Sequence, residues 1–303
     1  MPTTVLLHGV DFLSLGTPTL PNEYGVRQWR FMQRSPGPRV PSGGAGAGGE
    51  WMGKYRRPDF RIVSYAGNAE DVVLLRAFAG LRGGFFVDVG AGEPDSGSVT
   101  KNLVDRLGWR GVNLEPLPER HAHLMEQRPG DVSLRVAVGT VPGRARFHRV
   151  VAGPGQSGGG GLSTLLEDVA ARHRADGWRT EEFEVEVVTL ESVLAEHATV
   201  GFDLLKVDVE GAESDVLASV DLRQWRPRSV VVEATVPLTA EPSHEQWEPR
   251  LLAAGYVLTL FDGLNRWYAH KDEYELQAAL SVPANTLDRW IPVAWAEQLG
   301  YPV

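Results

Sequence analysis

The sequence contains no cysteine, and this excludes disulfide bonds, thiolate catalysis and cysteine-based zinc sites. The absence fits a reducing compartment, so we expect a cytoplasmic protein. No apolar run approaches the roughly 18 residues of a transmembrane helix. The short apolar stretch at the N-terminus has no Lys or Arg ahead of it, so we expect no secretory signal and no membrane partner.

Positive charge is also scarce. Lys and Arg number 30 against 39 for Asp and Glu, which gives a formal net charge of −9. A surface of that sign would repel phosphate backbones, so we do not expect a nucleic-acid partner. The hydrophobic content of 43% over 303 residues is enough for the core of one large α/β domain or of two small ones.

Glycine and proline mark a boundary at residues 35–50, where they supply nine of the sixteen positions. That composition favours a flexible linker. We therefore expect an N-terminal arm over residues 1–54, which includes this linker, and one domain over residues 55–303. The arm is either a partly ordered extension or a lid or dimer arm over the functional site, so a homodimer stays open.

From residue 55 onward the chain alternates between short apolar runs and segments of helical length. The apolar runs are Phe85–Val89, Gly111–Glu115, Ser133–Val138, Asp203–Val209 and Ser229–Ala234. Such alternation predicts βαβ units, and hence an α/β fold with a mostly parallel sheet covered on both faces. Asn68 followed by Asp71 is typical of a helix N-cap with an acidic residue at its third position.

Two departures from plain alternation are informative. Segments Arg144–Val150 and Phe183–Val188 flank a Gly-rich loop and a helical stretch over Ser163–Asp176, which indicates a β/α insertion between the third and fourth sheet strands. Near the C-terminus, two strand-like runs flank the turn over residues 262–265, which predicts an antiparallel hairpin. We therefore expect a seven-stranded sheet that ends as the class I methyltransferase fold, a Rossmann-like fold, does.

A nucleoside site is predicted where the first apolar run of this sheet gives way to a helix, at Asp88-Val-Gly90-Ala-Gly92. Glycine there lets the backbone approach a ligand closely, and the helix N-terminus offers unpaired N–H groups. Glu115 ends the next strand, 23 residues after Gly92, and a carboxylate at that place can accept both hydrogen bonds of a ribose diol. The structural alternative is that Glu115 only ends a strand at the surface.

The loop after the glycines favours S-adenosylmethionine over a nicotinamide cofactor. A dinucleotide fingerprint needs a small residue at the third position, where this chain has Asp95. The acidic run Glu93-Pro94-Asp95 also occupies the place where a pyrophosphate would lie. This charge disfavours a nicotinamide cofactor and suits S-adenosylmethionine, which has a ribose, a cationic sulfonium and no phosphate.

From about Tyr65 to Trp290, the chain resembles the FkbM-type methyltransferases. The resemblance rests on an ordered set of motifs: SYAGNAEDVVL, FVDVGAGEPDSGSVTKNL, GWRGVNLEPLPE, GLSTL, DLLKVDVEGAESDVL, VVVEAT, HEQWEP and FDGLNRWY. It implies a methyltransferase that depends on S-adenosylmethionine, usually an O-methyltransferase of sugars or secondary metabolites in natural product biosynthesis. Two positions depart from the family pattern, Gly67 and Ala69, where we expect Gln and Gly.

The resemblance also implies which residues bind the cofactor. Its candidates are Asp88, Gly90, Gly92 and Glu115, with Tyr65, Asn68, Ser98 and Ala137 in addition.

Transfer to a hydroxyl needs the acceptor oxygen held in place and its proton removed. In an open α/β sheet these groups lie beyond the carboxyl ends of the strands. Asp208 and Glu210 end one predicted strand, Glu233 ends the next, and His244 follows in the loop. We take these four as the candidate catalytic residues.

His244 is the candidate base, because a histidine side chain with a reference pKa of about 6.5 is largely neutral at pH 7. The alternative is a surface or cap histidine, and His173 is a weaker candidate that we expect on a helix surface. Asp208, Glu210 and Glu233 either bind acceptor hydroxyls, or hold a divalent cation such as Mg²⁺, or form a charged network with Lys206 and Arg228.

The sequence therefore predicts an S-adenosylmethionine-dependent O-methyltransferase that acts on a hydroxyl of a small-molecule acceptor, a sugar or a secondary metabolite. Three alternatives remain: an N-methyltransferase of the same fold, a nicotinamide-dependent oxidoreductase, and a non-catalytic cofactor-binding partner subunit.

Overall fold

The computed structural model describes residues 59–151 and 160–303. The predicted N-terminal arm and its linker lie outside the described residues, as does part of the predicted Gly-rich loop. These stay predictions.

Seven strands form the central sheet, in the order β10-β11-β9-β8-β2-β3-β4. Their bounds are β2 Phe85–Val89, β3 Arg110–Leu114, β4 Val132–Leu134, β8 Leu204–Val207, β9 Ser229–Glu233, β10 Tyr256–Phe261 and β11 Asn265–His270. The five strands from β9 to β4 are parallel, and β11 runs antiparallel to both β9 and β10. The predicted parallel sheet with an antiparallel C-terminal hairpin is confirmed.

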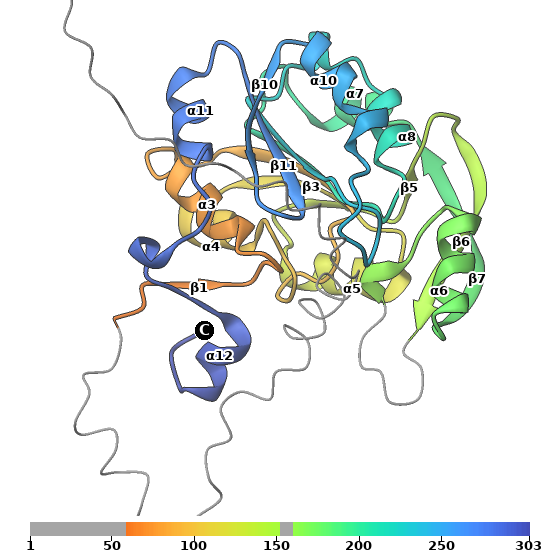
Figure 1. Cartoon of the computed structure of the whole chain (residues 1–303), viewed down its shortest axis with the longest axis horizontal. Coiled ribbons are helices and arrows are strands. Elements are labelled where there is room, and N and C mark those ends of the chain that lie inside the picture. Colours follow the sequence, from red (N-terminus) through yellow and green to blue (C-terminus); the bar gives the residue numbers. More distant parts are fainter. Residues whose placement is uncertain (1–58, 152–159) are drawn as a thin grey trace, which may run out of the picture. The chain divides into compact units, whose positions relative to one another are not determined.

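Helices cover both faces of this sheet, because its parallel strands carry apolar side chains on both sides. One face packs against α3 (Glu70–Ala77), α4 (Lys101–Leu107) and α11 (Tyr274–Leu280). The other packs against α7 (Leu190–His197), α8 (Glu213–Ala218), α9 (Leu222–Trp225) and α10 (Glu248–Ala253). Helix α5 (Pro118–Gln127) joins β3 to β4. The two helical layers lie on opposite sides of the strands in Figure 1.

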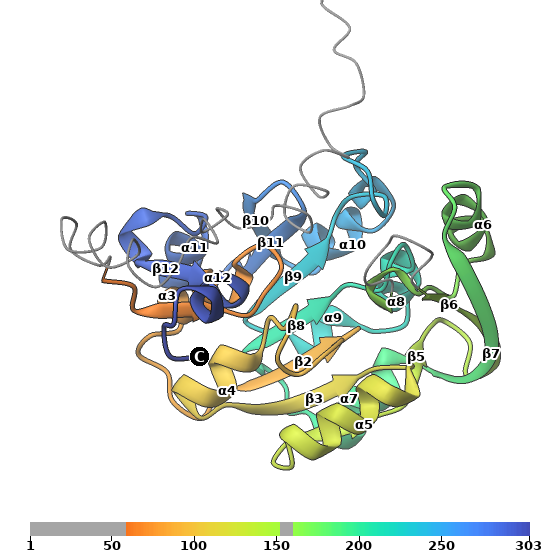
Figure 2. The ribbon, with the colours of Figure 1, turned by 90° about the horizontal axis from the view of Figure 1, so that it is seen from below.

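The predicted insertion between the third and fourth parallel strands is also present. It comprises β5 (Ala137–Val138), β6 (Gly143–Val151), η1 (Gly160–Leu162), α6 (Glu167–Ala175) and β7 (Arg179–Val188). Its strands form a separate sheet in the order β5-β7-β6. Figure 2 shows β6, β7 and α6 on the side toward which β2 and β3 point, so the insertion borders the carboxyl edge of the main sheet.

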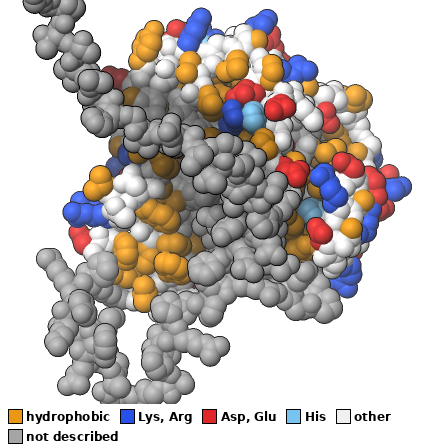
Figure 3. Space-filling view, in the orientation of Figure 1, with side chains coloured by type: hydrophobic (Ala, Val, Ile, Leu, Met, Phe, Trp, Pro, Cys, Tyr) orange, Lys and Arg blue, Asp and Glu red, His pale blue; other side chains and the backbone are white. Residues whose placement is uncertain are grey.

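A short second sheet pairs β1 (Ile62–Ser64) in parallel with β12 (Trp290–Pro292). The remaining elements are η2 (His244–Gln246), η3 (Thr286–Asp288) and α12 (Val293–Gln298). Within residues 59–151 and 160–303, every helix is too short or too polar to cross a membrane. On the face in Figure 3, basic and acidic side chains are interspersed.

Three local predictions were wrong. Helix α3 begins at Glu70, not after Asn68, and its cap position is Ala69, whose φ of 59° is left-handed. The run Ser133–Val138 is not one strand, because β4 pairs with β3 whereas β5 leaves the main sheet and pairs with β7. His173 is not on a helix surface but is buried, with 2% of its surface exposed.

Gly90 follows β2 at the point where this strand lies closest to the loop after β8. Its φ is 78°, and a Cβ built on it would lie 1.9 Å from the backbone oxygen of Asp208. Only glycine meets both conditions, since other residues disfavour this φ and their Cβ would collide with the backbone. The two loops can therefore meet at one edge of the sheet.

We predict that Gly90→Ala destabilises the protein more than Gly83→Ala. Gly83 has a similar φ of 67° but no atom within 4 Å of a built Cβ, so its variant adds only the left-handed strain of about 1–2 kcal/mol. Gly90→Ala adds overpacking of about 1–3 kcal/mol to that strain. Urea unfolding of both variants measures the difference, and equal losses would contradict the close approach.

Candidate active site

A cleft opens at the carboxyl ends of β2, β3 and β8, with about 860 Å³ of empty space. It is lined by the loop after β2, residues 90–97, which we call the glycine loop, by the loops after β3 and β8, and by the insertion. The lining residues include Gly90, Gly92, Glu93, Ser96, Gly97, Glu115, Leu117, Arg120, Val136, Ala137, Phe147, Ser163, Leu165, Lys206, Asp208 and Glu210. Polar groups thus meet an apolar wall in this cleft, a combination that is typical of small-molecule sites.

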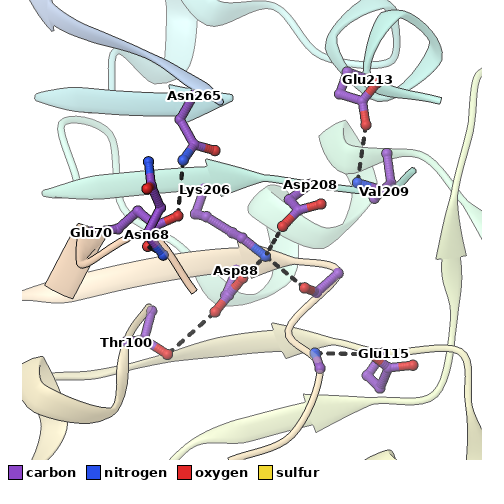
Figure 4. Close-up of polar contacts among 12 residues, drawn as sticks. Asn68, Glu70, Asp88, Thr100, Glu115, Lys206, Asp208, Val209, Glu213 and Asn265 are labelled. Atoms are coloured by element: carbon purple, nitrogen blue, oxygen red, sulfur yellow. Dashed lines mark hydrogen bonds and ion pairs between the residues drawn. The ribbon is translucent and has the colours of Figure 1, made fainter. Parts of the chain in front are cut away.

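Glu115 is fixed at one wall of this cleft. Its Oε2 accepts a hydrogen bond from the backbone N–H of Gly92 at 2.9 Å (Figure 4). Its Oε1 accepts one from the backbone N–H of Leu117 at 2.8 Å. Burial raises the pKa of this carboxyl, and Arg120 opposes that rise. Each oxygen keeps a second lone pair, so the carboxylate is oriented by the backbone and can still accept from a ligand.

Lys206 lies at the centre of the site. Its Nζ donates to the backbone oxygen of Gly90 at 2.6 Å and lies 3.2 Å from Asp88 and 3.5 Å from Asp208 (Figure 4). Burial opposes its charge, but Asp88 and Asp208 outweigh that effect and hold the pKa of Lys206 above its usual value. One buried cation therefore joins the loops after β2 and β8.

Behind this cation, the contacts continue to the glycine loop. Asp88 Oδ2 accepts from the Thr100 hydroxyl at 3.2 Å, and Thr100 accepts from the Arg128 guanidinium at 2.7 Å. Arg128 also donates to the backbone oxygen of Pro94 and to the Ser98 hydroxyl, at 2.6 and 2.7 Å. Arg128 thereby shapes the loop over residues 94–100, which contributes Ser96 and Gly97 to the cleft.

The predicted carboxylates come together on the other side of Lys206. Asp208, Glu210 and Glu233 each place an oxygen within 4.8 Å of the others. Burial, and then repulsion within this group, raises the pKa of Glu210 and of Glu233 well above the usual carboxyl value. Among the described residues, the buried Oε2 of Glu233 has no hydrogen-bond partner.

The loop that carries two of these carboxylates is held by three hydrogen bonds from two side chains. Glu213 Oε1 accepts from the backbone N–H groups of Val209 and Gly211, both at 3.1 Å. Burial raises the pKa of Glu213 to about 7. The Thr164 hydroxyl, from the insertion, donates to the backbone oxygen of Glu210 at 2.9 Å. These bonds hold Glu210 in its left-handed conformation, with φ 57°.

The predicted cofactor residues fall into two groups. Gly90, Gly92, Glu115 and Ala137 line the cleft, whereas Asp88 and Ser98 are buried behind it and hold other groups.

Tyr65 and Asn68 do not contribute to the cleft lining found among the described residues. The backbone N–H of Asn68 donates to Glu70 at 2.7 Å, and Glu70 accepts from the side chain of Asn265 at 2.8 Å (Figure 4). This N-terminal loop is therefore joined to the start of β11.

His244 lies just beyond β9, because the backbone N–H of Ser243 donates to the oxygen of Ala234 at 2.9 Å. Its Nε2 is 3.8 Å from Glu248, and 15% of its side chain is exposed. It is not among the residues that line the cleft.

The alternative network with Arg228 is wrong in part. Arg228 pairs with Asp203 at 3.0 Å and with Glu273 at 2.8 Å, and none of its ion pairs among the described residues is to the three carboxylates. Asp203 immediately precedes β8, so this pair lies at the amino end of the strand, whereas the carboxylates follow its carboxyl end.

Sequence reasoning missed Arg120, Arg128, Thr164 and Glu213. Only Glu213 has a local signal, since it lies in the run Val209-Glu-Gly-Ala-Glu213 that follows the strand. The others are brought in by tertiary packing from α5 and from the insertion.

Comparison with known proteins assigns the family. The model of the methyltransferase FkbM domain matches residues 88–258, more than half of the chain. The strand order and the antiparallel hairpin are those of the class I methyltransferase fold. The chain belongs to the FkbM methyltransferase domain family.

The chain is also similar to individual proteins, but each match covers only part of the chain or has low identity. Methyltransferase sdnD of Sordaria araneosa is 39% identical over 95 residues, which are 26% of this chain and 37% of that protein, so the match spans little more than a third of the relative. A TehB-like SAM-dependent methyltransferase from Corynebacterium glutamicum is 12% identical, with 67% of this chain and 88% of that one covered and a TM-score of 0.34. The cyclopropane synthase MmaA2 from Mycobacterium tuberculosis is 13% identical, with 63% and 60% covered and a TM-score of 0.31.

The buried carboxylates give a pH dependence with a definite sign. A carboxyl whose pKa is raised by folding holds its proton in the folded state at a pH where the unfolded chain has lost it. Its contribution therefore makes the protein less stable as pH rises above the unfolded value of about 4.5, until the folded carboxyl also ionises.

We predict that Glu233→Gln becomes more stabilising, relative to the parent chain, as pH rises from 5 to 8. The amide cannot ionise, so it escapes the growing cost of a buried charge. Urea unfolding of both proteins in EDTA at each pH measures the difference. A difference that is constant over this range would show that Glu233 ionises as readily in the fold as outside it.

Proposed function

We propose that this chain is an S-adenosylmethionine-dependent O-methyltransferase that acts on a hydroxyl of a sugar or of a secondary metabolite. The observation that carries the proposal is the pair of facing acidic walls in one cleft. Glu115 lies at one wall, and Asp208 and Glu210 lie at the other, with the glycine loop between them. Family membership supplies the reaction type.

The cleft fits the cofactor in its chemistry. Glu115 offers oxygens for a ribose diol, and the apolar wall of Leu117, Val136 and Phe147 suits a nucleobase. A Cβ built on Gly92 would have only Arg120 Nη1 near it, at 3.9 Å, so the loop leaves space for a ligand. Glu93 reaches the cleft where a pyrophosphate would need positive charge, which disfavours a nicotinamide cofactor.

S-Adenosylmethionine, when bound, supplies a methyl group that is already activated. The chain must then orient the acceptor, exclude water and take the hydroxyl proton. Asp208, Glu210 and Glu233 supply acceptors for the hydroxyls of a polyhydroxylated molecule. An acceptor with a phosphate would be repelled by the same charges, which favours neutral or cationic acceptors.

We assign the base role to His244, because the backbone N–H of its neighbour Ser243 donates to the oxygen of Ala234, the residue that follows Glu233. Its neighbour Glu248 also accepts from Tyr268 at 2.8 Å and contacts Arg266, so the carboxylate that faces the imidazole is held in place. Such a carboxylate can orient the ring of a histidine.

Glu115→Ala should weaken S-adenosylmethionine binding by about 1.5–3 kcal/mol, the scale of charge-assisted hydrogen bonds. Isothermal titration calorimetry measures the loss. Glu126→Ala, on the exposed face of α5, is the control and should bind as the parent chain does. Tight NADH binding together with no S-adenosylmethionine binding would contradict the cofactor assignment and favour the oxidoreductase alternative.

His244→Ala should lower kcat by about 10²–10⁴-fold with little change in cofactor affinity, which is the effect of losing a general base. The acid limb of the pH–rate profile should disappear in the variant. His197→Ala is a matched control, since His197 is 19% exposed and also lies 3.8 Å from a glutamate. Near-normal kcat for His244→Ala across pH would remove this histidine from the mechanism.

Cofactor binding by the parent chain without transfer to any hydroxyl or amine acceptor would favour the partner-subunit alternative. Transfer to amines alone would favour the N-methyltransferase.

A further inference from the structure

We propose that Asp208, Glu210 and Glu233 bind one hard divalent cation, whose remaining coordination positions face the cleft and take oxygen atoms of the acceptor. The binding of the cation stands on the geometry alone, and its contact with the acceptor rests on the proposed function.

The distances suit one ion. Carboxylate oxygens bind Mg²⁺ at about 2.0–2.1 Å and Ca²⁺ at about 2.3–2.6 Å, so two oxygens on opposite sides of an ion lie about 4–5 Å apart. One oxygen from each of the three residues lies within 4.8 Å of the others. Asp208 and Glu210 come from one loop and Glu233 comes from the neighbouring strand, so the donors approach from two elements.

Only one of the three carboxylates is ion-paired within the part of the chain that the structure describes. Lys206 lies closest to the Gly90 carbonyl and to Asp88, and it pairs with Asp208 at 3.5 Å. Among the described residues, neither Glu210 nor Glu233 has an ion pair with a basic side chain. Glu233 is 7% exposed, and its buried Oε2 has no hydrogen-bond partner among the described residues. A buried carboxylate oxygen is costly unless it is paired, protonated or bound to a metal.

The residues that line the cleft indicate where the free coordination positions of the cation would point. Asp208 and Glu210 line it, whereas Glu233 does not, so the cation would lie between Glu233 and the cleft. Oxygen atoms of an acceptor that enters the cleft could then complete the coordination. A cation there would orient the acceptor and lower the pKa of its hydroxyl.

A second group of possible ligands lacks these features. His148 has Glu167 at 3.3 Å from Nε2 and Glu182 at 3.5 Å from Nδ1, so its two carboxylates flank the ring from different nitrogens. Both are also paired with arginines, Arg174 and Arg146. This group is already neutralised by the protein.

The test is a Mn²⁺ titration of the full chain after EDTA treatment and desalting, without cofactor or acceptor. Free Mn²⁺ is followed by electron paramagnetic resonance. We expect one Mn²⁺ per chain, displaced by excess Mg²⁺, and a Kd at least about tenfold higher for Glu233→Gln because affinity follows ligand charge. Glu245→Gln, exposed in the same loop region, should match the parent chain.

Two results would overturn the proposal: no saturable Mn²⁺ binding at about 10⁻³ M, the weak end of protein sites, or an unchanged Kd in Glu233→Gln. A urea midpoint for Glu233→Gln in EDTA at or above that of the parent chain establishes that the variant folds. If it does not fold, Asp208→Asn takes its place, with the same expected rise in Kd.

The acceptor role has its own readout. Turnover should be lost in EDTA and restored by Mg²⁺ or Mn²⁺, and full turnover in EDTA would overturn that role. Mn²⁺ binding is measured without cofactor and should persist in Glu115→Ala. If the methyltransferase assignment is wrong, the chain does not bind S-adenosylmethionine but still binds Mn²⁺. If the cation site is wrong, the chain binds S-adenosylmethionine but not Mn²⁺.

Discussion

The buried ammonium group of Lys206 is the interaction on which the site depends. Asp88 and Lys206 are partners in the register of β2 and β8, and the Nζ of Lys206 also reaches the backbone of Gly90 and the side chain of Asp208. Removing one member of such a buried group leaves an uncompensated charge, which costs about 3–5 kcal/mol. Lys206 therefore contacts both the glycine loop and the loop after β8.

This arrangement gives the two sides of the cleft different chemistry. On the side of β3, Glu115 is oriented by two backbone N–H groups and is suited to hold a ribose. On the side of β9, three carboxylates lie together, and among the described residues only Asp208 is ion-paired, with Lys206. This grouping suits a cation or a polyhydroxylated acceptor. The insertion closes the cleft from the third side, since Phe147 and Leu165 line it and Thr164 holds the backbone of Glu210.

Sequence patterns predict the buried strands well and the contacts between distant segments poorly. Phe85–Val89 has the bounds that its apolar run predicts, because a parallel strand covered on both faces is a nearly continuous apolar run. The start of α3 is mispredicted because Ala69 adopts a left-handed conformation that no propensity favours. The departure of β5 from the main sheet depends on its pairing with β7, some fifty residues later, which no local pattern contains.

The same difference between predictable and unpredictable features is seen in the candidate site. The convergence of Asp208, Glu210 and Glu233 follows from strand order, since the carboxyl ends of neighbouring parallel strands meet at one edge. Arg128 has no signal in the sequence, because its role comes from the packing of α5 against the loop over residues 94–100.

A crystal structure of the chain with bound S-adenosylhomocysteine tests the central claim most directly. We expect both ribose hydroxyls within hydrogen-bond distance of Glu115, and the sulfur turned toward the loop that carries Asp208 and Glu210. A ribose bound away from Glu115, or a sulfur that faces away from these carboxylates, would contradict it.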